Sequence, residues 1–202
     1  MFPSAGRKAI LIDAGGVLVP GFLPAAAAAW GSRLGLSPDA VLGALFGGSD
    51  DQVLTGRVSE PAWWDIVAGR LGTGPQVTAE LRQDLAARER WDDTLTTFLR
   101  HLHGRAGTAI VSNAWPGMRH RMAQAGLLDI ADEIVLSCEV RYAKPDPRIY
   151  RTALGRLAAE PGAALFIDDT PGHVAAAEAL GLTGHVHTSA ASTMARITAF
   201  LR

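Results

Sequence analysis

The chain has 202 residues, of which 48% are hydrophobic and 19% charged, and its formal net charge is -1. This length indicates one domain, or one domain with a modest insertion, that can bury a core without disulfides. Balanced charge without a basic run argues against binding to nucleic acid or to an anionic membrane surface. The single cysteine, Cys138, cannot form an internal disulfide, which is typical of a reducing compartment.

The longest uncharged stretch, residues 14–32, does not have the character of a membrane helix or a signal peptide. Glycines and prolines interrupt it, and Asp13 would lie inside the apolar region of a signal sequence. We therefore expect a cytoplasmic protein without a membrane segment.

Short apolar runs alternate with helix-like segments along the whole chain. The runs are residues 9–12, 108–111, 133–136, 164–167 and 184–187. Runs of this length, bounded by turn residues, suit strands that are buried on both faces and connected by right-handed crossovers. The sequence therefore predicts an α/β fold with a doubly wound parallel sheet, in which Pro116, Pro147 and Pro171 each open a helix.

The interval between the first two predicted strands is far longer than one crossover helix requires. Helix starts are predicted within it at Ser37-Pro38, Ser59-Glu60-Pro61 and Thr78. We interpret residues 22–90 as a small all-helical cap domain, inserted into an α/β core domain formed by residues 1–21 and 91–202.

Polar side chains stand where the predicted strands end. They are Asp13 after the first strand, Ser112 and Asn113 after the second, Lys144 soon after the third, and Asp168 and Asp169 after the fourth. The carboxyl ends of parallel strands face one crevice, where such folds bind ligands. Three clustered carboxylates would raise one another's pKa values unless cations joined them. Lys144 is one cation, and a divalent ion held by oxygen ligands is the expected second.

The composition of the chain also supports a functional role for Lys144. Lys8 and Lys144 are the only lysines among 19 basic residues, and Asn113 is the only asparagine. A chain that otherwise uses arginine for positive charge has a compact ammonium group at this position.

Four segments, in order, carry a family resemblance. They are residues 10–18 (ILIDAGGVL), 111–113 (VSN), 144–150 (KPDPRIY) and 166–169 (FIDD). Together they resemble the four motifs of the haloacid dehalogenase superfamily, and the match spans nearly the whole chain. The inserted helices resemble the C1-type cap of that family. The first motif resembles a bacterial branch that includes sugar-phosphate phosphatases, and also segments fused to epoxide hydrolases.

The resemblance implies a role for each motif residue. Asp13 is the implied nucleophile, and Lys144 acts with it. Ser112, Asn113 and Lys144 are implied to hold the phosphoryl oxygens. Asp13, Asp168, Asp169 and the backbone carbonyl of Gly15 are implied to surround Mg²⁺. Trp115 lies at the expected rim of the crevice. The sequence favours neither of two roles for it, contact with substrate or ordinary packing.

Gly15 departs from the phosphatase pattern, which has a second aspartate at this position acting as general acid and base. Loss of such help typically slows a reaction by about 10²–10⁴-fold. The leading hypothesis is a magnesium-dependent hydrolase of small phosphorylated metabolites, as a monomer or homodimer. The alternatives are a 2-haloacid dehalogenase that uses Asp13 without metal, and a non-catalytic binding or regulatory protein.

A few other residues have plainer interpretations. We expect His173 to be a solvated helix residue, one of Trp63 and Trp64 to be core, and Cys138 to be an inert buried thiol. The remaining histidines have no spacing that implies a zinc site.

Overall fold

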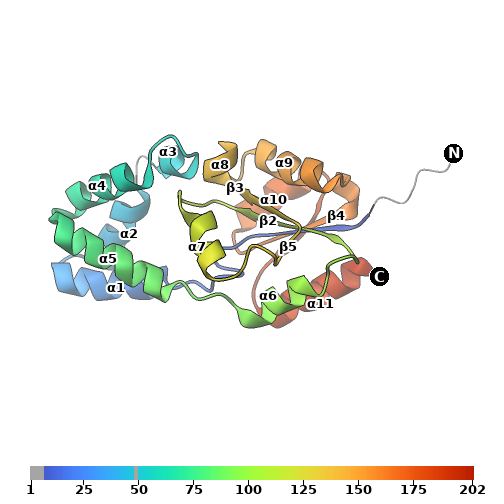
Figure 1. Ribbon diagram of the computed structural model, residues 1–202, viewed down its shortest axis with the longest axis horizontal. Coiled ribbons are helices and arrows are strands. Elements are labelled where there is room, and N and C mark those ends of the chain that lie inside the picture. The colour runs from blue at the N-terminus through green and yellow to red at the C-terminus, as the bar shows by residue number, and fades with distance from the viewer. Residues whose placement is uncertain (1–6, 48–49) are drawn as a thin grey trace.

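Five parallel strands form one sheet, as the apolar runs predict. A computed structural model, which describes residues 7–47 and 50–202, places them in the order β3-β2-β1-β4-β5 (Figure 1). The strands are β1 (Ala9–Ile12), β2 (Gly107–Ser112), β3 (Glu133–Leu136), β4 (Ala164–Asp168) and β5 (Thr183–Val186). The predicted α/β fold class is therefore confirmed, with strand ends shifted by one residue at most.

The central strand, β1, is buried on both faces and sets the register of its neighbours. Ile12 pairs with Ile110 of β2 and with Ile167 of β4. Every residue of β1 is fully buried, which explains why the run AILI lacks the polar alternation of a half-exposed strand.

Helices cover both faces of the sheet. On one face α6 (Asp93–Arg100), α7 (Met118–Gln124) and α11 (Ala190–Leu201) pack against a cluster that includes Ile10 and Ile12. On the other face α9 (Pro147–Leu157) and α10 (Pro171–Glu178) pack against a cluster that includes Leu11. The alternation of side chains along β1 thus supplies both cores. The short α8 (Ser137–Val140) follows β3, and a 3₁₀ turn, Pro161–Ala163, precedes β4.

Between β1 and α6, the described residues form five helices. They are α1 (Leu23–Leu34), α2 (Pro38–Phe46), α3 (Asp50–Leu54), α4 (Glu60–Leu71) and α5 (Pro75–Arg88), and we call residues 23–88 the helical insertion. It has a core of its own, in which Trp63 and Trp64 are both buried, although only one was expected to be. The division into domains at residues 22 and 90 stays a prediction.

Local signals explain most helix starts. The Ser37 hydroxyl accepts a hydrogen bond from the Ala40 N–H at 3.1 Å, which caps α2 as expected. Two predicted starts are wrong. Thr78 lies inside α5, where its hydroxyl donates to the Gly74 carbonyl. The helix expected at Pro116 begins at Met118, because Gly117 adopts the left-handed region with φ of +89°.

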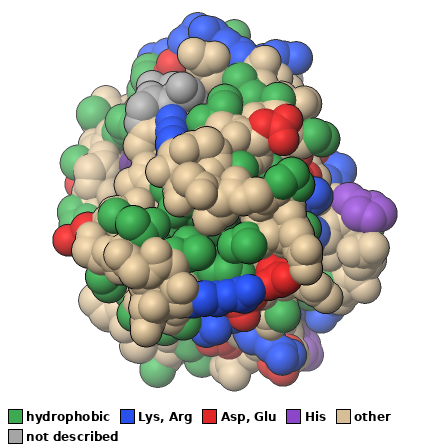
Figure 2. All heavy atoms as spheres, turned by 90° about the vertical axis from the view of Figure 1, so that its left-hand side faces the viewer, with side chains coloured by type: hydrophobic (Ala, Val, Ile, Leu, Met, Phe, Trp, Pro, Cys, Tyr) green, Lys and Arg blue, Asp and Glu red, His purple; other side chains and the backbone are tan. Residues whose placement is uncertain are grey.

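The outer face of the helical insertion carries both signs of charge. Figure 2 shows basic and acidic side chains interspersed with apolar ones on this end of the molecule. Within the described residues, no helix combines the length and apolar character needed to cross a bilayer.

The sheet core makes a matched stability prediction. Leu11→Ala, at a fully buried position in β1, should lower the free energy of unfolding by about 2–5 kcal/mol, because it leaves a cavity between close-packed layers. Leu128→Ala, at a residue that is 44% exposed, should change the free energy of unfolding by only about 0.5 kcal/mol. Urea unfolding of both variants checks this, and equal losses would contradict the assigned core.

Candidate active site

Asp13 lies directly after the central strand, where the backbone holds it in place. Its N–H donates to the Ile167 carbonyl at 2.9 Å, which extends the pairing of β1 with β4. The following loop closes on itself, because the Val19 N–H donates to the Ala14 carbonyl at 2.8 Å. The Ala14 N–H in turn donates to Asp13 Oδ1 at 2.7 Å. The Asp13 side chain, 9% exposed, therefore has a fixed orientation at the sheet edge.

Lys144 joins the two strand ends electrostatically. Its Nζ lies 2.8 Å from Asp13 Oδ1 and 2.6 Å from Asp168 Oδ2, and the Lys144 side chain is fully buried. Asn113 fixes the Lys144 backbone, because Asn113 Nδ2 donates to the Lys144 carbonyl at 2.9 Å and the Lys144 N–H donates to Asn113 Oδ1 at 2.7 Å. The only asparagine thus positions the lysine. Its expected contact with phosphate stays a prediction.

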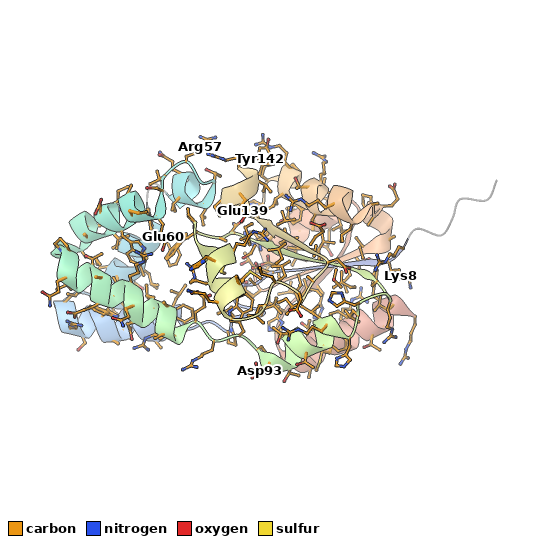
Figure 3. The ribbon with its side chains drawn as sticks, viewed as in Figure 1. Lys8, Arg57, Glu60, Asp93, Glu139 and Tyr142 are labelled. Carbon is orange, nitrogen blue, oxygen red and sulfur yellow. The ribbon has the colours of Figure 1, made fainter. Side chains whose placement is uncertain are left out.

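The other lysine is far from this cluster. Lys8 lies at the opposite end of the sheet, where its Nζ donates to the Phe200 carbonyl of α11 at 2.7 Å (Figure 3). Of the two lysines, only Lys144 lies at the carboxyl ends of the strands.

Asp168 accepts hydrogen bonds from several sides. The Thr170 N–H donates to Asp168 Oδ1 at 2.8 Å, and His173 Nδ1 lies 3.1 and 3.2 Å from the two oxygens. The expectation that His173 is simply solvated is wrong. The first turn of α10 folds back against the end of β4, and the Tyr150 hydroxyl supports it by donating to the His173 carbonyl at 2.9 Å.

The two buried carboxylates differ in acidity. Burial is the largest influence on the pKa of Asp13 and raises it, with a further contribution from the Asp168 charge, against the opposing ammonium of Lys144. Burial also acts to raise the pKa of Asp168, but hydrogen bonds from His173, Lys144 and the Thr170 N–H outweigh it and lower that pKa to about 2. Asp168 is therefore ionised at neutral pH, while Asp13 is the more basic group.

The geometry provides oxygen ligands for a divalent cation. Oxygens of Asp13, Asp168 and Asp169 all lie within 4.8 Å of one another. Three carboxylates beside the single ammonium of Lys144 leave an excess of two negative charges, which one Mg²⁺ would neutralise. Carboxylate oxygens are also the ligands that Mg²⁺ prefers, so this donor set fits the ion.

Asp169 packs against Gly16 of the first motif, and only glycine fits at position 16. Gly16 has φ of +75°, and a Cβ built there would lie 1.9 Å from Asp169 Oδ2. Gly15 is different. It is exposed, its φ lies outside the left-handed region, and no atom lies within 4 Å of a Cβ built on it. The loop therefore has room for a side chain at position 15.

The last two expected residues lie on β2 and in the loop that follows it. Ser112 is buried at the end of β2, in register with Leu136. Trp115 points into the helical insertion, with ring centroids 5.6 Å from Phe46, 6.2 Å from Trp63 and 5.9 Å from Trp64. Part of the Trp115 ring is therefore covered by packing against the aromatic side chains of the helical insertion. Cys138, expected to be buried, is instead partly exposed.

Comparison with known proteins identifies relatives of this chain. The family model for haloacid dehalogenase-like hydrolase matches residues 7–181. Bifunctional epoxide hydrolase 2 of Sus scrofa is 38% identical over 80 residues, which cover 37% of this chain and 14% of that protein. Acyl-CoA dehydrogenase family member 10 of Mus musculus is 41% identical over 51 residues, which cover 25% of this chain and 5% of that protein. The chain thus corresponds to a small part of these relatives.

Solved structures share the whole fold. A predicted HAD-like family hydrolase from Porphyromonas gingivalis has a TM-score of 0.78 at 23% identity, covering 98% of this chain and 99% of its own. A HAD family enzyme from Bacteroides thetaiotaomicron, in complex with magnesium and inorganic phosphate, has a TM-score of 0.70 at 18% identity, covering 92% and 96%. L-2-haloacid dehalogenase from Xanthobacter autotrophicus has a TM-score of 0.66 at 21% identity, covering 96% and 83%.

The two adjacent glycines should respond differently to alanine. Gly16→Ala should lower the free energy of unfolding by at least about 1–2 kcal/mol, the cost of a left-handed residue with a Cβ, because Asp169 must also move. Gly15→Ala should leave it unchanged or raise it by up to about 1 kcal/mol. Urea unfolding distinguishes the two, and a larger loss for Gly15→Ala would refute this description of the loop.

The lowered pKa of Asp168 predicts an acid-sensitive contribution to stability. Because its folded pKa of about 2 lies below the model-peptide value of 3.8, the unfolded state binds more protons between these values, and stability rises with pH there. The contribution is complete above about pH 4 and is lost as pH falls through 2. Denaturant unfolding between pH 2 and 5 should be less steeply pH-dependent in Asp168→Asn than in wild type. Identical slopes would count against the assigned contacts.

Proposed function

This chain belongs to the haloacid dehalogenase-like hydrolases, and we propose that within the family it is a magnesium-dependent phosphatase of small phosphate monoesters. The observation that carries the proposal is the carboxylate cluster of Asp13, Asp168 and Asp169, with Lys144 as its one buried ammonium. A divalent cation and a phosphoryl group are the partners that such a charge pattern suits.

In the proposed mechanism, Asp13 attacks phosphorus and forms an aspartyl phosphate as the leaving oxygen departs. Its oxygen Oδ1 is tied to Lys144 and to the Ala14 N–H, while Oδ2 accepts no hydrogen bond from any described residue and is the oxygen placed to attack. The raised pKa of Asp13 favours nucleophilicity. Water then attacks the acyl phosphate and releases inorganic phosphate.

Lys144 has two functions in this mechanism. It holds the Asp13 carboxylate in one rotamer, and its charge lies beside the position that a phosphoryl oxygen would occupy. Ser112 is proposed to donate its hydroxyl to that oxygen, and Asn113 keeps the Lys144 backbone in place.

Mg²⁺, held by Asp13, Asp168, Asp169 and the carbonyl of Gly15, would neutralise charge on the phosphoryl oxygens. The Bacteroides structure with magnesium and inorganic phosphate supports this assignment by its fold likeness.

A 2-haloacid dehalogenase is the second candidate, favoured by Gly15 and by the likeness to the Xanthobacter enzyme. In that reaction Asp13 would displace a halide from carbon. The two excess negative charges of the cluster argue against it, since they would repel the carboxylate of a haloacid unless a cation were bound.

The nucleophile and the metal can be tested together. Asp13→Asn should abolish phosphate release from acetyl phosphate with little change in stability, because an amide is nearly isosteric but not nucleophilic. Chelation of Mg²⁺ should abolish wild-type turnover, and its return should restore it. Metal-independent chloride release from 2-chloropropionate, without phosphate release from any monoester, would identify a dehalogenase instead.

Gly15 predicts which leaving groups are favoured. Without a side-chain acid, aryl and acyl phosphates should be hydrolysed well and alkyl phosphates poorly, because the former need little protonation as they leave. Gly15→Asp, which the open space at this position accommodates, should raise kcat/KM for alkyl phosphates relative to aryl phosphates by about 10-fold or more. The ratio of the two constants in both proteins is the measurement, and an unchanged ratio would show that position 15 does not govern protonation.

A further inference from the structure

A pocket of about 350 Å³ lies where the turn between α3 and α4 meets the loop after α8, and we call it the arginine pocket. Figure 3 shows Arg57 of the turn and Tyr142 of the loop on the same side of the molecule. The lining includes Gln52, Arg57, Arg141, Tyr142, Asp146 and Arg148. One wall of the arginine pocket therefore belongs to the helical insertion and the other to the core.

The described side chains of the arginine pocket carry more positive than negative charge. Three arginines line the pocket, and Asp146 is the only carboxylate in the described lining. Arg148 neutralises Asp146, because Arg148 Nη2 lies 2.6 Å from Asp146 Oδ2. Neither Arg57 nor Arg141 forms an ion pair with a described residue. Two positive charges in the pocket are therefore left without a carboxylate.

Most hydrogen-bond donors of Arg57 and Arg141 have no acceptor within the described part of the chain. A guanidinium group has five N–H donors. Arg57 is exposed and donates none of them to a described residue. Arg141 uses one, because its Nη1 donates to the Gly56 carbonyl at 2.9 Å. An oxyanion between the two walls would therefore find free donors on both.

Arg141 has a backbone conformation that favours glycine. Its φ is +70°, in the left-handed region, where a Cβ is unfavourable. The side chain is therefore present at a cost that glycine would avoid. Its hydrogen bond to the carbonyl of Gly56 holds the Arg141 guanidinium beside Arg57, the next residue of the chain. Two neighbouring like charges repel each other, and an anion that lies between them removes this repulsion.

Arg148 gives the core wall a third guanidinium group, which is held in a fixed position. Arg148 Cζ lies 3.9 Å from the centroid of the Tyr142 ring, and Arg148 Nε and Nη2 both donate to Asp146. Stacking and pairing together restrict the rotamers of Arg148. Less conformational entropy is therefore lost when an anion binds beside it.

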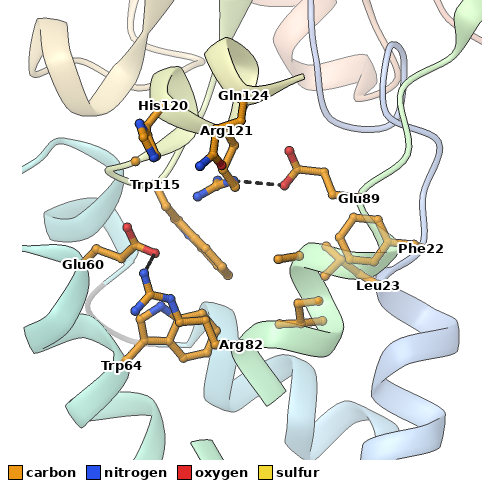
Figure 4. A pocket seen from close by; sticks show the side chains of 13 residues that line it. Phe22, Leu23, Glu60, Trp64, Arg82, Glu89, Trp115, His120, Arg121 and Gln124 are labelled. Carbon is orange, nitrogen blue, oxygen red and sulfur yellow. Dashed lines mark ion pairs between the residues drawn. The ribbon is translucent and has the colours of Figure 1, made fainter. Parts of the chain in front are cut away.

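The cavity between the helical insertion and α7 has the opposite arrangement of charge. Figure 4 shows Glu60 paired with Arg82 and Glu89 paired with Arg121, at 2.9 and 3.2 Å. Both of these arginines have a carboxylate partner. Arginines without a carboxylate are therefore not a general feature of the junction between the insertion and the core.

The arginine pocket is separate from the carboxylate cluster. Of the residues proposed for the active site, Lys144 alone belongs to the described lining. The side chain of Lys144 is fully buried and its Nζ is held by Asp13 and Asp168, so its charge is already neutralised. An anion in the arginine pocket is therefore a different group from the phosphoryl group that Asp13 would attack.

We propose that the arginine pocket binds a phosphate group, which links the helical insertion to the core through Arg57 and Arg141. A phosphate dianion matches the two unpaired positive charges, and its tetrahedral oxygens accept hydrogen bonds from guanidinium groups on two walls. The volume of about 350 Å³ lies in the range of about 300–1,000 Å³ that is typical of small-molecule sites, so the pocket has room for a phosphorylated metabolite as well as for inorganic phosphate. The inference does not depend on the chemistry at Asp13.

Calorimetric titration of the protein in EDTA, at constant ionic strength, tests the site. The probes are inorganic phosphate and glycerol 3-phosphate. Without a divalent metal the carboxylate cluster has an excess of two negative charges and repels both probes, so the titration reports on the arginine pocket.

Three variants make the test specific. Arg57→Gln removes a charge that has no partner among the described residues, and Arg141→Gly removes a guanidinium while suiting the left-handed backbone, so both are expected to fold. Arg105→Gln is the matched control, because Arg105 is also exposed, pairs with no described residue and does not line the arginine pocket.

The expected result is saturable binding in wild type that Arg57→Gln and Arg141→Gly each weaken by at least about 10-fold, with the affinity unchanged in Arg105→Gln. Tighter binding of glycerol 3-phosphate than of inorganic phosphate would identify a phosphorylated metabolite as the occupant, and the reverse order would identify inorganic phosphate. No saturable binding in wild type, equal affinity in wild type and Arg57→Gln, or the same loss in Arg105→Gln would overturn the inference.

Discussion

The ammonium group of Lys144, buried between Asp13 and Asp168, is the interaction on which the proposed active site depends. Two buried carboxylates at neighbouring strand ends would repel each other, and one would be protonated, if no cation lay between them. The order of the strands brings the two aspartates together, because β1 and β4 are adjacent in the sheet. Asn113 completes the arrangement by holding both backbone polar groups of Lys144.

The sheet and the polar strand ends could be predicted from sequence because each depends on local pattern. Strands buried on both faces are continuous apolar runs, and a parallel sheet necessarily gathers their carboxyl ends. The contact of His173 with Asp168 could not be predicted, since it depends on the direction in which α10 leaves β4. The aromatic partners of Trp115 could not be predicted from sequence either, because they lie in helices whose packing against one another is not specified by hydrophobic periodicity. The predicted start of α7 is wrong because the left-handed conformation of Gly117 delays the helix.

A short loop after β2 contacts both the helical insertion and the catalytic edge. Residues 112–117 end β2, position Lys144 through Asn113, and send Trp115 into the aromatic cluster of the insertion. Gly117 brings the loop against Glu60 of α4, where a Cβ would lie 2.5 Å from the Glu60 carboxylate. The loop that positions Lys144 therefore also packs against the helical insertion.

The central claim is that Asp13, oriented by Lys144, becomes covalently phosphorylated during turnover. The most direct measurement is mass spectrometry of peptides from enzyme quenched in acid during steady-state hydrolysis of acetyl phosphate with Mg²⁺. The account predicts a phosphoryl group on the peptide that contains Asp13, and on that residue alone. Turnover without a phosphorylated Asp13 peptide, or with the phosphoryl group on another residue, would contradict it.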